Sequence, residues 1–154
     1  FASVANVFGI IISATVFGLY LTYAQIPQKL TSLILGMDVG PIGFLLLVNV
    51  MLLIMGMLID SAAVLLIAVP LLYPVAMQLG IDPIHFGIVC ILNLSIGALT
   101  PPFGATMYQC CNLCEIEMPE FLKQGKELIA ALLIALLVVT FVPGIATLLP
   151  AMMK

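Results

Sequence analysis

Long uncharged runs are the feature that most restricts what this chain can fold into. Its 154 residues carry only seven acidic and four basic side chains. The charges separate five uncharged runs: 1–28, 39–59, 61–81, 83–114 and 128–153. A helix needs about 20 predominantly apolar residues to cross the hydrocarbon core of a bilayer, so each run is long enough to hold one. The sequence therefore predicts an all-α integral membrane protein.

The composition excludes several classes of soluble protein. Hydrophobic residues make up 64% of the chain and charged residues 7%, whereas about a quarter of the residues in a soluble domain are charged. A cytosolic enzyme, a nucleic-acid-binding protein and a disordered chain are excluded. The sequence begins at Phe1 without the features of a signal peptide. We therefore expect a fragment of a longer polypeptide that lies in the lipid bilayer.

Two segments read as generic membrane-spanning helices, residues 4–24 and 128–149. In the second of them, Pro143 is expected to bend the helix and Pro150 to end it, because proline lacks a backbone N–H. We assign residues 115–154 to a solvated loop followed by this final transmembrane helix.

A shorter segment, residues 25–41, is unlike the spans. Pro27 is suited to the first turn of a helix and Gly36 to its end. The apolar residues between them follow a single helical stripe. The segment is too short to cross a bilayer, so we expect a helix lying in the interface.

Residues 42–79 contain two apolar runs that flank the short piece Gly56–Ser61. Gly56 weakens the first helix, and either Asp60 or Ser61 can cap the second by accepting backbone N–H bonds. Two topologies fit this pattern: two full spans with an external turn, or a re-entrant hairpin whose tip stops inside the membrane. The residue pattern leaves this choice open. A re-entrant tip would be a binding-site candidate, because irregular backbone at that depth must be buried in protein or line a cavity.

Residues 83–114 predict a broken helix. Asp82 followed by Pro83 is a strong helix start, with an acidic cap before a proline in the first turn. The segment Gly97–Gly104 then combines two glycines with two adjacent prolines that directly follow Thr100. It lies in the middle of a 32-residue uncharged run, so the break is expected at the centre of the bilayer.

A helix broken inside a membrane frees carbonyl and N–H groups, and transporters use such groups to hold substrates and coupling ions. The side-chain oxygens of Thr100, Ser95 and Asn93 suit a small, hard cation. Asp60 is a functional candidate if it is buried and a helix cap if it is exposed. His85 is expected near the lipid headgroups rather than in a proton relay.

Enzyme chemistry has no support in the sequence. Cys110, Cys111 and Cys114 lack a second ligand pair or a neighbouring His, so we expect no transition-metal site. No nucleotide-binding loop and no catalytic triad are recognised, and we expect no cofactor.

Residues 55–108 closely resemble the C-terminal half of the large, DctM-type membrane subunit of TRAP (tripartite ATP-independent periplasmic) transporters. The flanking spans fit this family less specifically. The resemblance rests on the order and spacing of these pieces: Gly56–Asp60, Pro70, Pro74, Gly80–Gly87 and Asn93–Gly104 with its Thr-Pro-Pro core.

This resemblance implies one repeat of an elevator-type transporter. Residues 1–24 would be a scaffold helix and residues 25–41 an arm that joins the scaffold to the transport domain. Residues 42–114 would belong to the transport domain, with a re-entrant hairpin over 42–79 and the broken helix over 83–114. The family also implies that residues 115–127 face the cytoplasm. The few lysines do not decide which side of the membrane these residues face.

The implied activity is sodium-coupled uptake of an organic acid, such as a C4-dicarboxylate or a sialic acid, across a bacterial or archaeal inner membrane. A periplasmic binding protein would deliver the solute, and a small four-helix membrane subunit would accompany the permease. The alternative is a channel or ion-translocating subunit of a larger complex, in which the broken helix lines a pore.

The resemblance also implies two overlapping sets of site residues. The sodium-binding set is Gly56, Met57, Asp60, Gly97, Thr100 and Pro102. The solute-pocket set is Asp60, Ser61, Asn93, Ser95, Thr100 and Gly104.

Overall fold

The computed structural model describes residues 40–58, 60–101 and 104–152, together with scattered positions from Ile12 to Gly36. The scaffold helix expected over 1–24 and the interfacial helix expected over 25–41 fall almost wholly outside the described residues. Both stay predictions.

Every regular element in the three continuous described ranges is a helix. The helices are α3 (Pro41–Leu58), α4 (Ser61–Gln78), α5 (Pro83–Leu99), α6 (Ala105–Cys114), α7 (Met118–Phe141) and α8 (Pro143–Met152). Three of these, α3, α4 and α7, are long and apolar enough to cross a membrane. The prediction of an all-α membrane protein is confirmed at this level.

Aspartate caps begin two of the helices, as the sequence predicts. One carboxylate oxygen of Asp60 accepts the backbone N–H groups of Ala62 and Ala63, at 2.9 and 3.4 Å, and thereby starts α4. Asp82 caps α5 in the same way, with Pro83 in the first turn. Each cap satisfies two N–H groups that have no partner within the helix.

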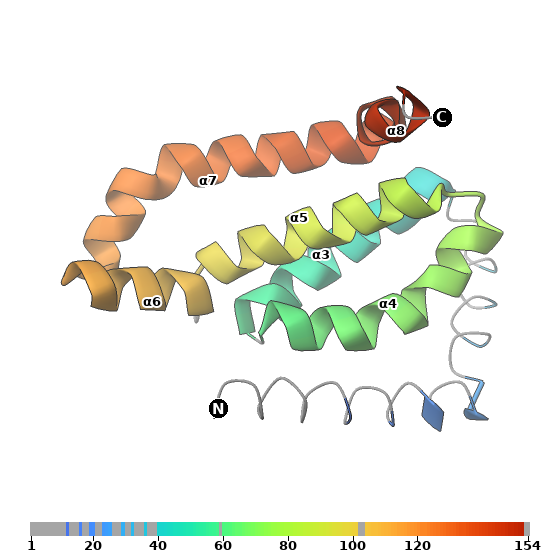
Figure 1. Ribbon diagram of the computed structural model, residues 1–154, viewed down its shortest axis with the longest axis horizontal. Helices are drawn as coiled ribbons and strands as arrows, with labels where there is room; N and C mark the ends of the chain where they lie inside the picture. The colour runs from blue at the N-terminus through green and yellow to red at the C-terminus, as the bar shows by residue number, and fades with distance from the viewer. Residues whose placement is uncertain are drawn as a thin grey trace.

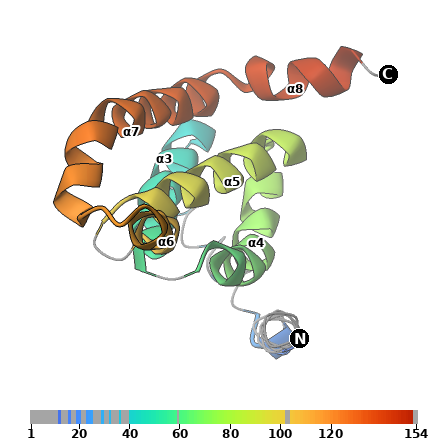
Figure 2. The same ribbon diagram turned by 60° about the vertical axis from the view of Figure 1, so that its left-hand side comes forward.

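Helix α5 lies at the centre of the arrangement. Figure 1 shows it between α7 and α4, with α3 running alongside it, and Figure 2 shows α3 near both α5 and α7. The most extensive packing of α5 is against α3. The core between these helices is aliphatic and aromatic. Its members include Phe44, Val48 and Leu52 of α3, Val64, Leu72 and Val75 of α4, Phe86, Val89 and Leu94 of α5, and Leu136 of α7.

The last span differs from the expected single helix over 128–149. Helix α7 begins earlier, at Met118, and ends at Phe141, while α8 runs past Pro150 to Met152. Pro143 separates the two helices rather than bending one, because it disfavours the α conformation at the preceding residue. Val142 accordingly has φ −118° and ψ 82°. Pro150 removes only one backbone hydrogen bond near the end of α8 and does not stop it.

Candidate functional site

The turn between α3 and α4 lies against the C-terminal part of α5 (Figure 1). Gly56 and Gly97 bring the two backbones together: a Cβ atom on Gly97 would lie 2.9 Å from both the Cα and the carbonyl carbon of Gly56. The Ser61 hydroxyl donates to the Leu94 carbonyl at 3.2 Å. The structure therefore assembles the predicted residues Gly56, Ser61 and Gly97 at one place.

The end of α5 turns sharply at Thr100. Its backbone N–H donates to the Gly97 carbonyl at 3.0 Å, and its hydroxyl donates to the Ile96 carbonyl at 2.6 Å. Gly104 then adopts a left-handed conformation with φ +33°, and α6 begins at Ala105. Pro102, part of the predicted sodium site, lies outside the described residues.

The adjacent prolines release one carbonyl that the sequence prediction overlooks. The helical donor to the Ala98 carbonyl would be the N–H of residue 102, and that residue is a proline. The Ala98 carbonyl faces the Gly104 backbone, since a Cβ atom on Gly104 would lie 3.3 Å from it and 3.0 Å from the Thr100 carbonyl. The proline four positions later is the signal that identifies Ala98.

The remaining predicted residues are less uniformly placed. Asp60 is exposed and serves as the helix cap, and Met57 is half-buried near the same turn. Asn93 is fully buried, while Ser95 is exposed. Two residues apart on a helix point in nearly opposite directions, so α5 does not bring Asn93 and Ser95 together.

Asn93 instead belongs to a buried polar chain that crosses three helices. Its amide nitrogen donates to the side-chain oxygen of Asn49, and Asn49 donates to the Thr140 hydroxyl at 2.8 Å. The side-chain oxygen of Asn93 is buried and has no partner among the described residues. Sequence reasoning missed Asn49 and Thr140, which read as isolated polar residues within apolar runs.

His85 is buried, contrary to the expected headgroup environment. Its side chain is 3% exposed and its Nε2 lies 2.8 Å from the Val139 carbonyl of α7. Helix α7 covers this end of α5. The spacing of Asp82 and His85 in the sequence does not predict that contact.

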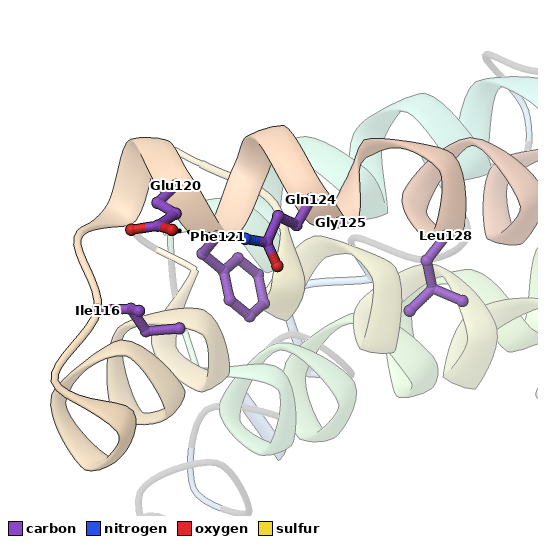
Figure 3. A pocket seen from close by; sticks show the side chains of 6 residues that line it. All are labelled: Ile116, Glu120, Phe121, Gln124, Gly125 and Leu128. Carbon is purple, nitrogen blue, oxygen red and sulfur yellow. Dashed lines mark hydrogen bonds between the residues drawn. The ribbon is translucent and has the colours of Figure 1, made fainter.

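A separate pocket lies at the turn between α6 and α7, away from the α3–α4 turn. It has a volume of about 300 Å³. Figure 3 shows its lining residues Ile116, Glu120, Phe121, Gln124, Gly125 and Leu128. Of the three cysteines on α6, Cys110 and Cys114 are exposed and Cys111 is buried. Among the described residues, no three His, Cys, Asp or Glu side chains are grouped as metal ligands.

Apolar helices of spanning length, joined by a short turn that packs on α5, define a multi-pass membrane protein of the all-α class. Residues 1–145 match the family described as "Tripartite ATP-independent periplasmic transporter, DctM component". The chain belongs to this family.

Several named permeases are similar to this chain. It is 36% identical over 144 residues to the C4-dicarboxylate TRAP transporter large permease protein DctM of Vibrio cholerae, covering 94% of this chain and 32% of that protein. It is 41% identical over 140 residues to the sialic acid TRAP transporter large permease protein SiaM of the same species, covering 91% of this chain and 33% of that protein. It is 36% identical over 132 residues to the isethionate TRAP transporter permease protein DctMQ of Oleidesulfovibrio alaskensis, covering 86% of this chain and 21% of that protein. The chain spans about a third of the length of the first of these relatives.

Proposed function

We propose that this chain holds a coupling sodium ion between a re-entrant hairpin and a broken helix, within a secondary transporter of the inner membrane. The observation that carries the proposal is the backbone contact between Gly56 and Gly97, which places the α3–α4 turn beside the end of α5. An elevator-type mechanism, in which this unit moves against a fixed scaffold, is part of the proposal.

The depth of the α3–α4 turn supports a re-entrant hairpin. Helices α3 and α4 are each long enough to cross a bilayer, so their length alone does not decide. The segment 97–104 lies near the centre of the uncharged run 83–114, and this position supports a location near the centre of the bilayer. Since Gly56 contacts Gly97, the turn reaches the same depth.

The chemistry of the carbonyl groups near the end of α5 supports a sodium site. The Ala98 and Thr100 carbonyls lie together beside Gly104, and the Thr100 hydroxyl is adjacent in the chain. Oxygen ligands of this kind suit a hard cation. In the proposed site, the end of α3 adds Gly56 and Met57, the α3–α4 turn adds Asp60, and Gly97 and Pro102 complete the α5 side.

Helix α6 supplies a feature suited to an anionic solute. Its N-terminal residue follows Gly104, which has no side chain to cap the free N–H groups. The positive end of a helix dipole with unpaired N–H groups favours a carboxylate. Thr100 lies next to this end, since its carbonyl oxygen is 3.0 Å from a Cβ atom placed on Gly104. The proposed solute pocket combines Thr100 and Gly104 with the polar side chains of Asp60, Ser61, Asn93 and Ser95.

The identity of the solute and the partners follow by analogy. The relatives are named for C4-dicarboxylates, sialic acid and isethionate, which are all organic anions. We propose an organic anion as the solute, delivered by a periplasmic binding protein to a permease that works with a small membrane subunit.

The adjacent prolines offer a direct test in the full-length protein, reconstituted with its partner proteins in liposomes. Replacing Pro101 and Pro102 with alanine restores helical N–H donors to the Gly97 and Ala98 carbonyls, so sodium-driven uptake should fall at least about tenfold. The control replaces Pro70 and Pro74 of α4 with alanine, which also restores two helical donors away from the proposed ion site. Equal sodium dependence in both variants would refute the site, and ohmic single-channel currents would support a pore instead.

A further inference from the structure

Two neighbouring residues of α7, Val139 and Thr140, carry polar contacts to two different helices. His85 of α5 places its Nε2 2.8 Å from the Val139 carbonyl, and Asn49 of α3 donates to the Thr140 hydroxyl at 2.8 Å. His85, Asn49 and Thr140 are all buried, with exposures of 3%, 4% and 1%. These contacts are therefore made inside the helix packing and not at its surface.

The Val139 carbonyl is available because of Pro143. In an α-helix this carbonyl accepts the N–H of the residue four positions later, which here is a proline without an N–H. An unpaired carbonyl is unfavourable in an apolar membrane protein. Because a carbonyl only accepts, the His85 ring must carry its hydrogen on Nε2, and it replaces the missing backbone donor.

The direction of the second contact follows from counting hydrogens. The Thr140 hydroxyl has one hydrogen, which it donates to the Leu136 carbonyl at 2.7 Å, so it can only accept from Asn49. This turns the amide nitrogen of Asn49 toward α7 and its oxygen toward Asn93, which donates to it. Thr140 therefore fixes the orientation of Asn49, and the unpartnered side-chain oxygen of Asn93 is the end of this polar chain.

We propose that Val139 and Thr140 form a polar clasp through which α7 is held against α3 and α5, with His85 and Asn49 as positioning residues. Lipid tails are as apolar as leucine side chains, so apolar contact alone gives a membrane helix little preference for a protein neighbour over lipid. Much of α7 outside the clasp is exposed, including Ile134, Leu137 and Phe141. The clasp selects the neighbours of α7, and this inference is independent of sodium coupling.

Amide hydrogen exchange across residues 136–146, measured by mass spectrometry on the full-length protein in lipid nanodiscs, tests the clasp. His85→Leu removes the donor while keeping an apolar side chain, and exchange should become about three- to tenfold faster. His85→Gln keeps an N–H near the position of Nε2 and should stay within about twofold of the wild type. Thr140→Val and Thr140→Ser form a matching pair for the second contact, with faster exchange expected only for valine.

A second-site variant separates the clasp from a general loss of packing. Pro143→Ala returns a backbone N–H that can reach the Val139 carbonyl, so His85→Leu should have a smaller effect in that background. Pro70→Ala, which alters a proline in α4 instead, should not reduce the effect of His85→Leu. The proposal would be overturned if amide exchange in His85→Gln were as fast as in His85→Leu. It would also be overturned if His85→Leu had equal effects in the Pro143→Ala and Pro70→Ala backgrounds.

Discussion

The replacement of Gly97 by alanine probes the contact on which the proposed site depends. A Cβ atom at this position would lie 2.9 Å from the Cα and carbonyl carbon of Gly56 and 3.2 Å from the Leu53 carbonyl oxygen. All three atoms belong to the backbone of α3, so no side-chain rotation can relieve the overlap. The two helices must separate where the α3–α4 turn meets the end of α5.

The expected magnitude follows from two opposing effects. Overpacking of a tight contact costs about 1–3 kcal/mol. Alanine is better than glycine in a helix interior by about 1 kcal/mol. We therefore expect Gly97→Ala to lower the free energy of unfolding by up to about 2 kcal/mol. Sodium-driven uptake should fall as well, because the turn is displaced from α5.

Two other glycines provide graded controls. For Gly56 the nearest atoms to an added Cβ are at 3.4 Å, so Gly56→Ala should have a smaller effect than Gly97→Ala. Gly87, on the same helix as Gly97, has no atom within 4 Å of the added Cβ. Gly87→Ala should be neutral or stabilising, through its gain in helix propensity alone.

Thermal unfolding of the purified full-length protein, combined with uptake in proteoliposomes, measures both consequences. The expected order of stability is Gly87→Ala, then Gly56→Ala, then Gly97→Ala. If Gly97→Ala were as stable and as active as Gly87→Ala, the close approach of α3 and α5 would not exist in the membrane.

Three further outcomes are expected. Asp60→Ala and Asp82→Ala each remove a helix cap and should lower the free energy of unfolding by about 1 kcal/mol. Only Asp60→Ala should also reduce sodium-driven uptake. Equal uptake in the two variants would contradict a role for Asp60 in the site. In a cysteine-free background, a cysteine at Leu58 should react more slowly with a water-soluble maleimide when sodium and solute are present. A control cysteine at Leu113 should react at the same rate with and without them. Full labelling at Leu58 under all conditions would favour an external turn. Gly104→Ala should reduce both uptake and stability, because Gly104 has φ +33° and an added Cβ would lie 3.0 Å from the Thr100 carbonyl. The loss of stability should appear as a lower midpoint of thermal unfolding. An unchanged midpoint would contradict a turn that requires glycine.

Local features of the fold could be predicted from the sequence because their causes are local. Asp60 and Asp82 are followed at once by the N–H groups that they cap, and both caps are present. The prolines after Thr100 lack the N–H groups that the carbonyls four residues earlier would accept in a helix. Helix α5 accordingly ends at Leu99. Uncharged run length predicted membrane helices, and the family match supports that interpretation.

Contacts between distant residues could not be predicted in this way. Asn49 and Thr140 are 91 residues apart, and His85 and Val139 are 54 apart. In each pair, a polar side chain lies within an apolar run, and the surrounding sequence carries no information about its partner. The burial of His85 depends on where α7 packs, and the end of α7 depends on Pro143 acting as a break rather than a bend. These features follow from tertiary packing, which periodicity does not encode.

The sodium concentration that gives half-maximal uptake tests the central claim most directly. Thr100→Val removes a hydroxyl at the proposed site, and Thr147→Val is a matched control, since both hydroxyls donate to the carbonyl four residues earlier. With the full-length protein in proteoliposomes, Thr100→Val should raise this concentration about tenfold or more, as expected when a direct ion ligand is lost, while Thr147→Val should leave it unchanged. The same sodium dependence in both variants would contradict an ion site between the α3–α4 turn and the end of α5.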